Sequence, residues 1–386
     1  MIGRSLIVAA DLGLGLACGV MAVLVVVVKV VRAAAQSARQ ARAAPYRDAV
    51  LAIAAGGDED DTAGSVLRGI RGRDWRAVRD VVTGTLGKVR GDTTVPLVRL
   101  LDARGEFERA RSALRSRLAL RRARAAYLLG LARQPSDVGL LLPLLADRAA
   151  EVRLVTTRSL GSVGDPIAAT ALFAALGPVH GNPGIPTTVA AEALLSFGVG
   201  AVPAVLEALS SEDATQRVVA TLVAAEGALS AAAPHLRALL ASDPDLDVRI
   251  AAARALGAVG GPGDVAELAA LTEPARPTEL RRAAVQALGD LGHPDAAPVL
   301  SWLLSDPDVR LAQRSGDALV QLGPAGVRTL LQAADGPAAR VAAGSLTIAR
   351  LRKAPQVAGL ALPSQRGAPP AREPGRELAA EPGSPR

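Results

Sequence analysis

The sequence predicts an all-α chain in which helical hairpins stack into an α-solenoid, preceded by one transmembrane helix. Three observations support this prediction. An amphipathic helix recurs about every thirty residues between positions 75 and 353, a period typical of helical repeats. Turn-forming Gly and Pro residues separate the helices of each unit. The first 32 residues contain an apolar run that is long enough to span a bilayer.

The repeat unit is clearest at Asp247–Gly260, which we expect to form one helix. Its apolar residues recur at spacings of three and four, as on one helix face: Val248, Ala252, Ala255, Leu256 and Val259. The residues Asp243–Asp245 provide turn and N-cap chemistry upstream, and Gly257 allows a neighbouring helix to come close. A second amphipathic run follows at Val265–Leu271. The unit is therefore a helical hairpin.

Each unit is recognised by a marker residue, typically an Arg near the start of the helix with Leu seven and Gly eleven residues later. The successive markers are Arg122, Arg153, Thr187, Gln216, Arg249, Arg281 and Arg310. After Arg310 the helix is two residues longer, because Leu319 and Gly323 come late. The markers are 29 to 34 residues apart, so we expect a solenoid over residues 75–353.

Short motifs in these repeats resemble a known family. Val248-Arg249, Ala255-Leu-Gly257 and Gly292-His-Pro294 are similar to the short bacterial HEAT-like repeats first associated with phycobilisome linker lyases. The resemblance covers roughly residues 75–350, and together with the apolar run before them it suggests a bacterial membrane-anchored HEAT-repeat protein. Such repeats are general binding scaffolds, so the resemblance implies a fold more firmly than a function.

The resemblance also implies a structural ladder, in which each marker Arg bonds an Asp of the preceding turn. Planar, bidentate pairing of this kind suits Arg that is wholly or partly buried. The implied ladder arginines are Arg122, Arg153, Arg249, Arg281 and Arg310. Their implied partners are Asp147, Asp247 and Asp306.

Residues 1–32 are predicted to be an N-terminal transmembrane anchor. The uncharged core Leu12–Val28 covers about 25 Å as a helix. A signal peptide is the alternative, since Ala33-Ala-Ala35 could imitate a cleavage site, but Lys29 and Arg32 lie between it and the apolar core. Gly15 and Gly19 form a GxxxG pair, which either supports a homodimer of the anchor or reflects the frequency of small residues in membrane helices.

Positive charge on one side of the anchor predicts its orientation. Lys29, Arg32, Arg39, Arg42 and Arg47 follow the apolar run, whereas only Arg4 precedes it. The positive-inside rule then predicts a single-pass protein of the cell membrane, with its N-terminus outside and its C-terminal domain cytoplasmic.

Three further segments complete the expected organisation. Residues 33–74 are predicted to form a helical stalk and an N-terminal cap, residues 75–353 the solenoid, and residues 354–386 a Pro-rich disordered tail. Residues 68–133 carry 16 Arg and one Lys against six acidic residues. These charges are solvated helix faces, or they contact an anionic membrane surface or a partner. Nucleic acid is the least favoured reading, because aromatic residues for base stacking are scarce.

The exposed positions of the solenoid helices are candidate partner-binding residues. They fall five residues beyond each marker: Tyr127, Arg158, Glu192, Arg254 and Gln286, with Arg282 alongside. The resemblance implies that these helices line a concave face, and a row of mixed charge suits a protein partner. The projecting loop at residues 177–186 adds His180 and Asn182 as polar tips. An ordinary solvated face and a simple hairpin insertion are the alternatives.

Residues for catalysis are scarce. The three histidines each lie in or beside a turn, the one Cys lies in the apolar run, and no GxxxxGK[ST] phosphate loop is present. We therefore expect no metal, no cofactor and no enzyme activity, and a scaffold that binds a protein partner, with a membrane glycosyltransferase as one guess. The alternatives are a bilin or tetrapyrrole lyase-like enzyme, or a binder of anionic lipid or nucleic acid through residues 68–133.

Overall fold

The structure is a computed structural model of the 386-residue chain, and it describes residues 2–56, 62–89, 91–334 and 338–351. The chain divides into two compact units, residues 1–201 (unit 1) and residues 202–386 (unit 2). Helices dominate both units, and the only β pairing among the described residues is an isolated bridge between Val179 and Asn182. The Pro-rich tail predicted at 354–386 lies outside the described residues.

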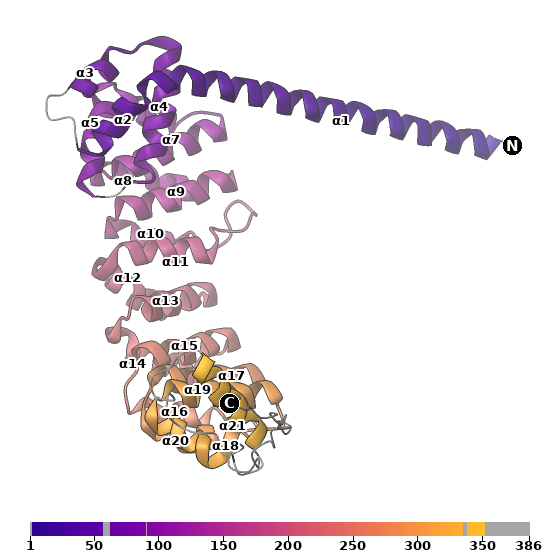
Figure 1. The fold of residues 1–386 in the computed structure, drawn as a ribbon, viewed down its shortest axis with the longest axis vertical. Helices are drawn as coiled ribbons and strands as arrows, with labels where there is room; N and C mark the ends of the chain where they lie inside the picture. The colour runs from indigo at the N-terminus through magenta and orange to yellow at the C-terminus, as the bar shows by residue number, and fades with distance from the viewer. Residues whose placement is uncertain (1, 57–61, 90, 335–337, 352–386) are drawn as a thin grey trace, which may run out of the picture. The chain divides into compact units, whose positions relative to one another are not determined.

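Unit 1 begins with the long helix α1 (Ile2–Ala43), drawn in indigo in Figure 1. Within the described residues it is the one helix long and apolar enough to cross a membrane, judged by length and composition. The side chains of Val20, Leu24 and Val31 are exposed, as expected for an apolar helix with no neighbour. Pro45 lies in the short 3₁₀ helix η1 (Ala44–Tyr46), directly after the end of α1.

Short helices surround the C-terminal end of α1, which packs against α4. They are α2 (Arg47–Ala54), α3 (Thr62–Gly69), α4 (Gly72–Leu86), η2 (Asp92–Thr94), α5 (Val95–Ala103) and α6 (Glu106–Ala113). Trp75 and Val78 of α4 and Phe107 of α6 are buried in this region. Apolar residues at helical spacing therefore give this part of unit 1 a core of its own.

The repeats of unit 1 follow. They consist of α7 (Ala119–Ala132), η3 (Pro135–Asp137), α8 (Val138–Leu141), η4 (Leu142–Ala146), α9 (Ala150–Val163), η5 (Pro166–Ala168), α10 (Ala169–Ala174), α11 (Thr187–Ser196) and η6 (Gly198–Ala201). We call α7, α9 and α11 marker helices, because each carries a marker position of the repeat. They pack side by side (Figure 1), and α8, η4 and α10 pack against them.

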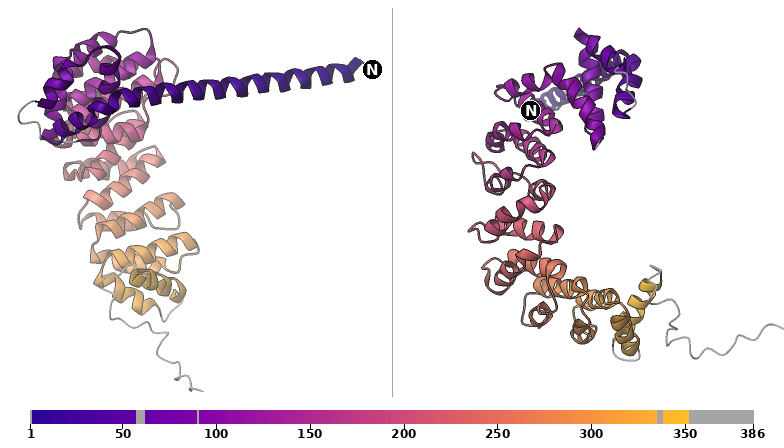
Figure 2. Two further views of the ribbon diagram at one scale, coloured as in Figure 1. Left: turned by 45° about the horizontal axis from the view of Figure 1, so that its top comes forward. Right: turned by 90° about the vertical axis from the view of Figure 1, so that its left-hand side faces the viewer.

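Unit 2 continues the same arrangement. Its elements are α12 (Val202–Leu209), α13 (Ala214–Glu226), η7 (Ser230–Ala232), α14 (Ala233–Ser242), α15 (Leu246–Val259), α16 (Asp264–Ala270), α17 (Thr278–Leu291), η8 (Pro294–Ala296), α18 (Ala297–Leu303), α19 (Val309–Gln321), α20 (Pro324–Ala333) and α21 (Ala339–Leu351). The marker helices of unit 2 are α13, α15, α17 and α19. They pack in that order, and α12, α14, α16 and α18 form the second layer (Figure 2).

Glycines set the distance between neighbouring marker helices. A Cβ added at Gly257 of α15 would lie 2.7 Å from Cα of Ala287 in α17, and one at Gly161 of α9 would lie 2.9 Å from Cα of Ala193 in α11. Such distances leave no room for a methyl group, so the helix backbones touch at these points. The prediction that Gly257 serves a close approach is confirmed. The predicted all-α solenoid of helical hairpins is confirmed as well.

Candidate functional site

Ion pairs join successive repeats, and those of Arg122 and Arg217 are bidentate. In unit 1, Nε and Nη2 of Arg122 both lie 2.7 Å from the carboxylate oxygens of Asp147. In unit 2, Arg217 binds Asp243 through the same two nitrogens at 2.7 and 2.9 Å, and Arg281 pairs with Asp306. The carboxylates are nearly buried in all three pairs. Charges that are removed from water in this way require such pairing.

The partner Asp comes from the following turn and not from the preceding one. Asp147 lies 25 residues after Arg122, and Asp243 lies 26 residues after Arg217. The preceding turn contributes backbone oxygens instead: Nη1 of Arg217 donates to the carbonyls of Ser211 and Glu212 at 2.8 and 2.9 Å. Each guanidinium therefore fastens its own helix to two turns. The expectation from the resemblance was wrong in direction, because the following turn packs beside the Arg while the preceding turn presents only carbonyls to it.

Arg153 completes the ladder in a different way. Its side chain is 1% exposed, and it donates to the carbonyls of Asp147 and Pro183 at 2.8 and 2.6 Å. Pro183 belongs to the inserted loop, whose tip residues His180 and Asn182 are exposed. The inserted loop therefore supplies a carbonyl where the repeats of Arg122, Arg217 and Arg281 receive a carboxylate, and this contact ties the loop to α9.

Three residues of the expected ladder lie elsewhere. Arg249 is half-buried, and the hydrogen bond of its side chain is Nε to the carbonyl of Leu240 at 3.3 Å. Proline occupies position 274, 25 residues downstream, so no carboxylate is available there. Arg310 and Asp247 are exposed. Ala312, and not Arg310, takes the ladder position, because it is the fourth residue of α19, as Arg281 is of α17. The expected lengthening of this helix by two residues is wrong, since α19 has 13 residues and α17 has 14.

Arg217 is a ladder residue that sequence analysis missed. The weak repeat there was assigned to Gln216, one residue too early, because Leu and Gly do not follow at the usual spacings. The pair of an Arg with a Thr four residues later would have identified it. Oγ1 of Thr221 donates to the carbonyl of Arg217, as Oγ1 of Thr157 does to the carbonyl of Arg153.

Ion pairing lowers the pKa of the ladder carboxyl Asp147. Burial of Asp147 opposes this change, but hydrogen bonds from Arg122 and from the backbone N–H of Ala149 outweigh it and hold the pKa below 3.8. The pair is therefore charged at neutral pH.

The predicted partner-binding positions are exposed on the marker helices. Tyr127, Arg158 and Glu192 form one row in unit 1. Arg254 and Gln286 form a second row in unit 2, which Leu222 extends because it lies five residues after Arg217. Around these positions the chain is buried: Thr157 and Ser159, for example, flank Arg158 and are at most 3% exposed. We call the row of unit 1 and the row of unit 2 the exposed rows. Arg282 does not belong to them, because it pairs with Asp308 and Glu279 at 2.7 and 2.6 Å.

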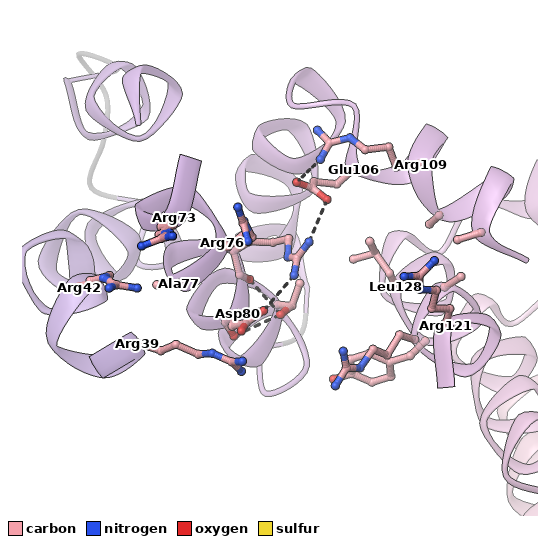
Figure 3. A pocket seen from close by; sticks show the side chains of 17 residues that line it. Arg39, Arg42, Arg73, Arg76, Ala77, Asp80, Glu106, Arg109, Arg121 and Leu128 are labelled. Carbon is pink, nitrogen blue, oxygen red and sulfur yellow. Dashed lines mark hydrogen bonds and ion pairs between the residues drawn. The ribbon is translucent and has the colours of Figure 1, made fainter. Parts of the chain in front are cut away.

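A pocket of about 780 Å³ lies in unit 1 between α1, α4, α6 and α7. Eight arginines and two carboxylates line it, namely Arg39, Arg42, Arg73, Arg76, Arg79, Arg109, Arg121, Arg124, Asp80 and Glu106. The side chains of Arg39 and Arg42 lie on one side of the pocket and that of Arg121 on the other (Figure 3). Tyr127, at the start of the unit 1 row, also lines this pocket. We call it the arginine pocket.

The two carboxylates of the arginine pocket are already engaged. Glu106 accepts a hydrogen bond from Nε1 of Trp75 at 2.6 Å, and it pairs with Arg109 at 3.0 Å and with Arg79 at 3.6 Å. Asp80 pairs with Arg79 at 3.4 Å. Six arginines have no carboxylate partner within the described part of the chain: Arg39, Arg42, Arg73, Arg76, Arg121 and Arg124. The pocket is therefore strongly cationic.

Metal-binding clusters do not accompany these features in the described part of the chain. No group of three or more His, Cys, Asp or Glu side chains there is arranged to hold a metal ion. Nδ1 of His293 accepts a hydrogen bond from the backbone N–H of Asp295, in the turn that begins η8. His235 lies on α14, and His180 lies in the inserted loop of unit 1.

Comparison with known proteins gives the class of the chain. A profile of HEAT repeats matches residues 202–278 and 268–347. A crystal structure of a Kap121p mutant is similar over 68% of this chain and 33% of its own, with 12% identity and a TM-score of 0.50. The chain is therefore an α-solenoid. Residues 202–347, where the profile matches, contain HEAT repeats.

Two further solved structures are similar at lower TM-scores. The complex of CpcE and CpcF of phycocyanin lyase from Nostoc sp. PCC7120 matches at 21% identity, over 58% of this chain and 92% of its own, with a TM-score of 0.31. Human deoxyhypusine hydroxylase matches at 19% identity, over 72% of this chain and 96% of its own, with a TM-score of 0.28. No curated protein matches the chain.

Proposed function

We propose that this protein is a non-catalytic scaffold, anchored in the cell membrane by α1, that binds a protein partner on the exposed rows of a cytoplasmic solenoid. The observation that carries the proposal is the pattern of exposure on the marker helices. Each row presents one side chain per helix from a surface of buried residues. The ladder and the glycine contacts hold consecutive helices of a unit in fixed register.

The chemistry of the rows favours a protein partner. Unit 1 presents an aromatic, a cationic and an anionic side chain in succession, and unit 2 presents Leu222, Arg254 and Gln286. A binder of a uniform polymer would repeat one kind of side chain, whereas interfaces between proteins mix aromatic, apolar and charged groups. Membrane attachment through α1 would raise the local concentration of the scaffold near partners in the same membrane.

A pull-down with matched variants tests this proposal. The full-length protein is gently extracted from its native membranes, and the proteins that copurify are measured by quantitative mass spectrometry. The row variant carries Ala at Arg158, Glu192 and Arg254. The control variant carries Ala at Arg148, Glu207 and Arg276, which are exposed residues of the same types outside the rows.

We expect one partner to copurify stoichiometrically with the wild type and the control variant, and to be lost from the row variant. Equal recovery with both variants would show that the rows do not bind the partner. Recovery of no protein with the wild type would contradict the scaffold function itself.

A further inference from the structure

The arginine pocket carries an inference that does not depend on the scaffold function. Seven of its eight arginines come from three helices, each of which repeats Arg at a spacing of three residues, and the eighth, Arg109, lies on α6. Arg39 and Arg42 lie on α1, Arg73, Arg76 and Arg79 on α4, and Arg121 and Arg124 on α7. This spacing puts the members of each set on one helix face. In the folded protein the three helix faces line the same pocket.

The chain itself does not neutralise this charge. Ladder arginines such as Arg122 have an Asp within 2.7 Å, whereas the six unpaired arginines of the pocket have none among the described residues. Like charges in a shared space repel one another, and water and salt screen this repulsion only in part. An anion that enters the pocket would remove the repulsion and gain several charge-assisted hydrogen bonds.

Small buried residues keep the space open. Ala77 of α4, Ala110 of α6 and Ala125 of α7 line the pocket, and each is at most 5% exposed. Larger side chains at these three positions would fill the space between the helices. The resulting volume of about 780 Å³ lies in the range of small-molecule sites, roughly 300 to 1,000 Å³.

We propose that the arginine pocket binds a ligand that carries two or more phosphate groups. The planar guanidinium fork matches phosphate oxygens in bidentate geometry. A single phosphate group carries at most about two negative charges. Six unpaired arginines can accommodate more negative charge than that. Nucleic acid fits the pocket less well, because Tyr127 is its one aromatic lining residue, and single-stranded binding uses aromatic platforms along an extended groove.

The phosphate groups could belong to a lipid or to a soluble molecule. The exposed apolar residues of α1 extend to Val31, and Arg39 follows eight residues later on the same helix, about 12 Å along its axis. The headgroup layer extends roughly 5–8 Å beyond the hydrocarbon core. If α1 spans a bilayer to Val31, the pocket opens within several ångströms of the headgroups, where a lipid diphosphate can reach it.

Binding is measured by calorimetric titration of the full-length protein in neutral detergent micelles. Four ligands are compared: inorganic pyrophosphate, farnesyl diphosphate incorporated in the micelles, phosphatidylglycerol at matched micelle charge, and a single-stranded oligonucleotide. The pocket variant is Arg42→Gln/Arg121→Gln/Arg124→Gln. The control variant is Arg99→Gln/Arg115→Gln/Arg117→Gln, which removes the same charge from exposed arginines of unit 1 outside the pocket. Circular dichroism checks that all three proteins have the same helix content.

We expect wild type and control to bind pyrophosphate equally, and the pocket variant to bind at least about tenfold more weakly, because it loses charge-assisted hydrogen bonds. Tighter binding of farnesyl diphosphate than of pyrophosphate would assign the site to a lipid, and equal binding to a soluble ligand. The proposal is overturned if the wild type binds neither diphosphate, or if both variants lose affinity equally. It is also overturned if phosphatidylglycerol or a single-stranded oligonucleotide binds more tightly than both diphosphates.

Discussion

The Arg217–Asp243 pair offers the sharpest test of how the repeats are held together. Substitution Arg217→Met keeps the aliphatic stem and removes the guanidinium. The substitution breaks two hydrogen bonds to Asp243, at 2.7 and 2.9 Å, and two to backbone carbonyls of the preceding turn. It leaves the carboxylate of Asp243, which is 2% exposed, with the backbone N–H of Asp245 as its remaining partner.

Removing one member of a buried ion pair costs about 3–5 kcal/mol, because the other charge stays buried without its counterion. We expect a loss of this size in the free energy of unfolding of the part of unit 2 around α13 and α15. Repeat proteins can unfold in parts, so hydrogen exchange measured by mass spectrometry is the appropriate assay. The amides of α13 and α15 should exchange faster, while those of α7 and α9 in unit 1 should not change.

The double variant Arg217→Met/Asp243→Leu separates the pair from simple loss of packing. Replacing both partners by apolar side chains removes the isolated charge, so the double variant should be more stable than Arg217→Met alone. Unchanged exchange in Arg217→Met would refute the view that the ladder fastens neighbouring repeats. A double variant no more stable than the single one would show that the carboxylate is not the source of the loss.

Two other predictions concern the same scaffold. Gly257→Ala should destabilise α15 and α17 by about 1–3 kcal/mol through overpacking, since the new Cβ would lie 2.7 Å from Cα of Ala287; urea unfolding should show no such loss for Gly261→Ala, where nothing lies within 4 Å. The pKa of Asp147 in the folded protein is held below 3.8, so in acid the unfolded chain binds more protons than the folded one. The Arg122–Asp147 pair therefore contributes its full stability above about pH 4, and this contribution is lost as the pH falls through the lowered pKa of Asp147 in the folded protein. Asp147→Asn should be less stable than the wild type at pH 7, and the difference in stability should shrink as the pH falls below 4. A difference in urea unfolding that stays constant from pH 7 to pH 3 would contradict this reasoning.

Much of the fold could be predicted from local patterns. The spacing of Val248, Ala252 and Leu256 defines one helix face, and the turn after Gly260 ends that helix. These features depend on residues within a few turns of one another, so they can be read without knowing the fold. The exposed rows follow from the same periodicity, and this is why Arg158, Glu192, Arg254 and Gln286 were found at the expected positions.

The ladder shows where local patterns were insufficient. The Arg markers are visible in the sequence, but the Asp partner lies 25 or 26 residues away, in a turn that only packing brings near. In α19 the helix starts only one residue before Arg310, and in α13 the Arg stands one residue after Gln216. Such small shifts move the ladder position without changing the helix pattern. The sequence therefore predicts Arg310 and Gln216 at the positions that Ala312 and Arg217 take in the structure.

Local sequence patterns are enough to define the helices, their repeat and the strongly basic character of residues 68–133. They do not reveal the arginine pocket, although the Arg spacing of three is visible in each contributing segment. Segments around residues 39–42, 73–79 and 121–124 are separated by tens of residues, and a surplus of charge on each is compatible with separate solvated faces. Only the packing of α1 against α4, and of α4 against α7, brings these faces to one space, because hydrophobic burial on the opposite sides of the helices fixes their orientation.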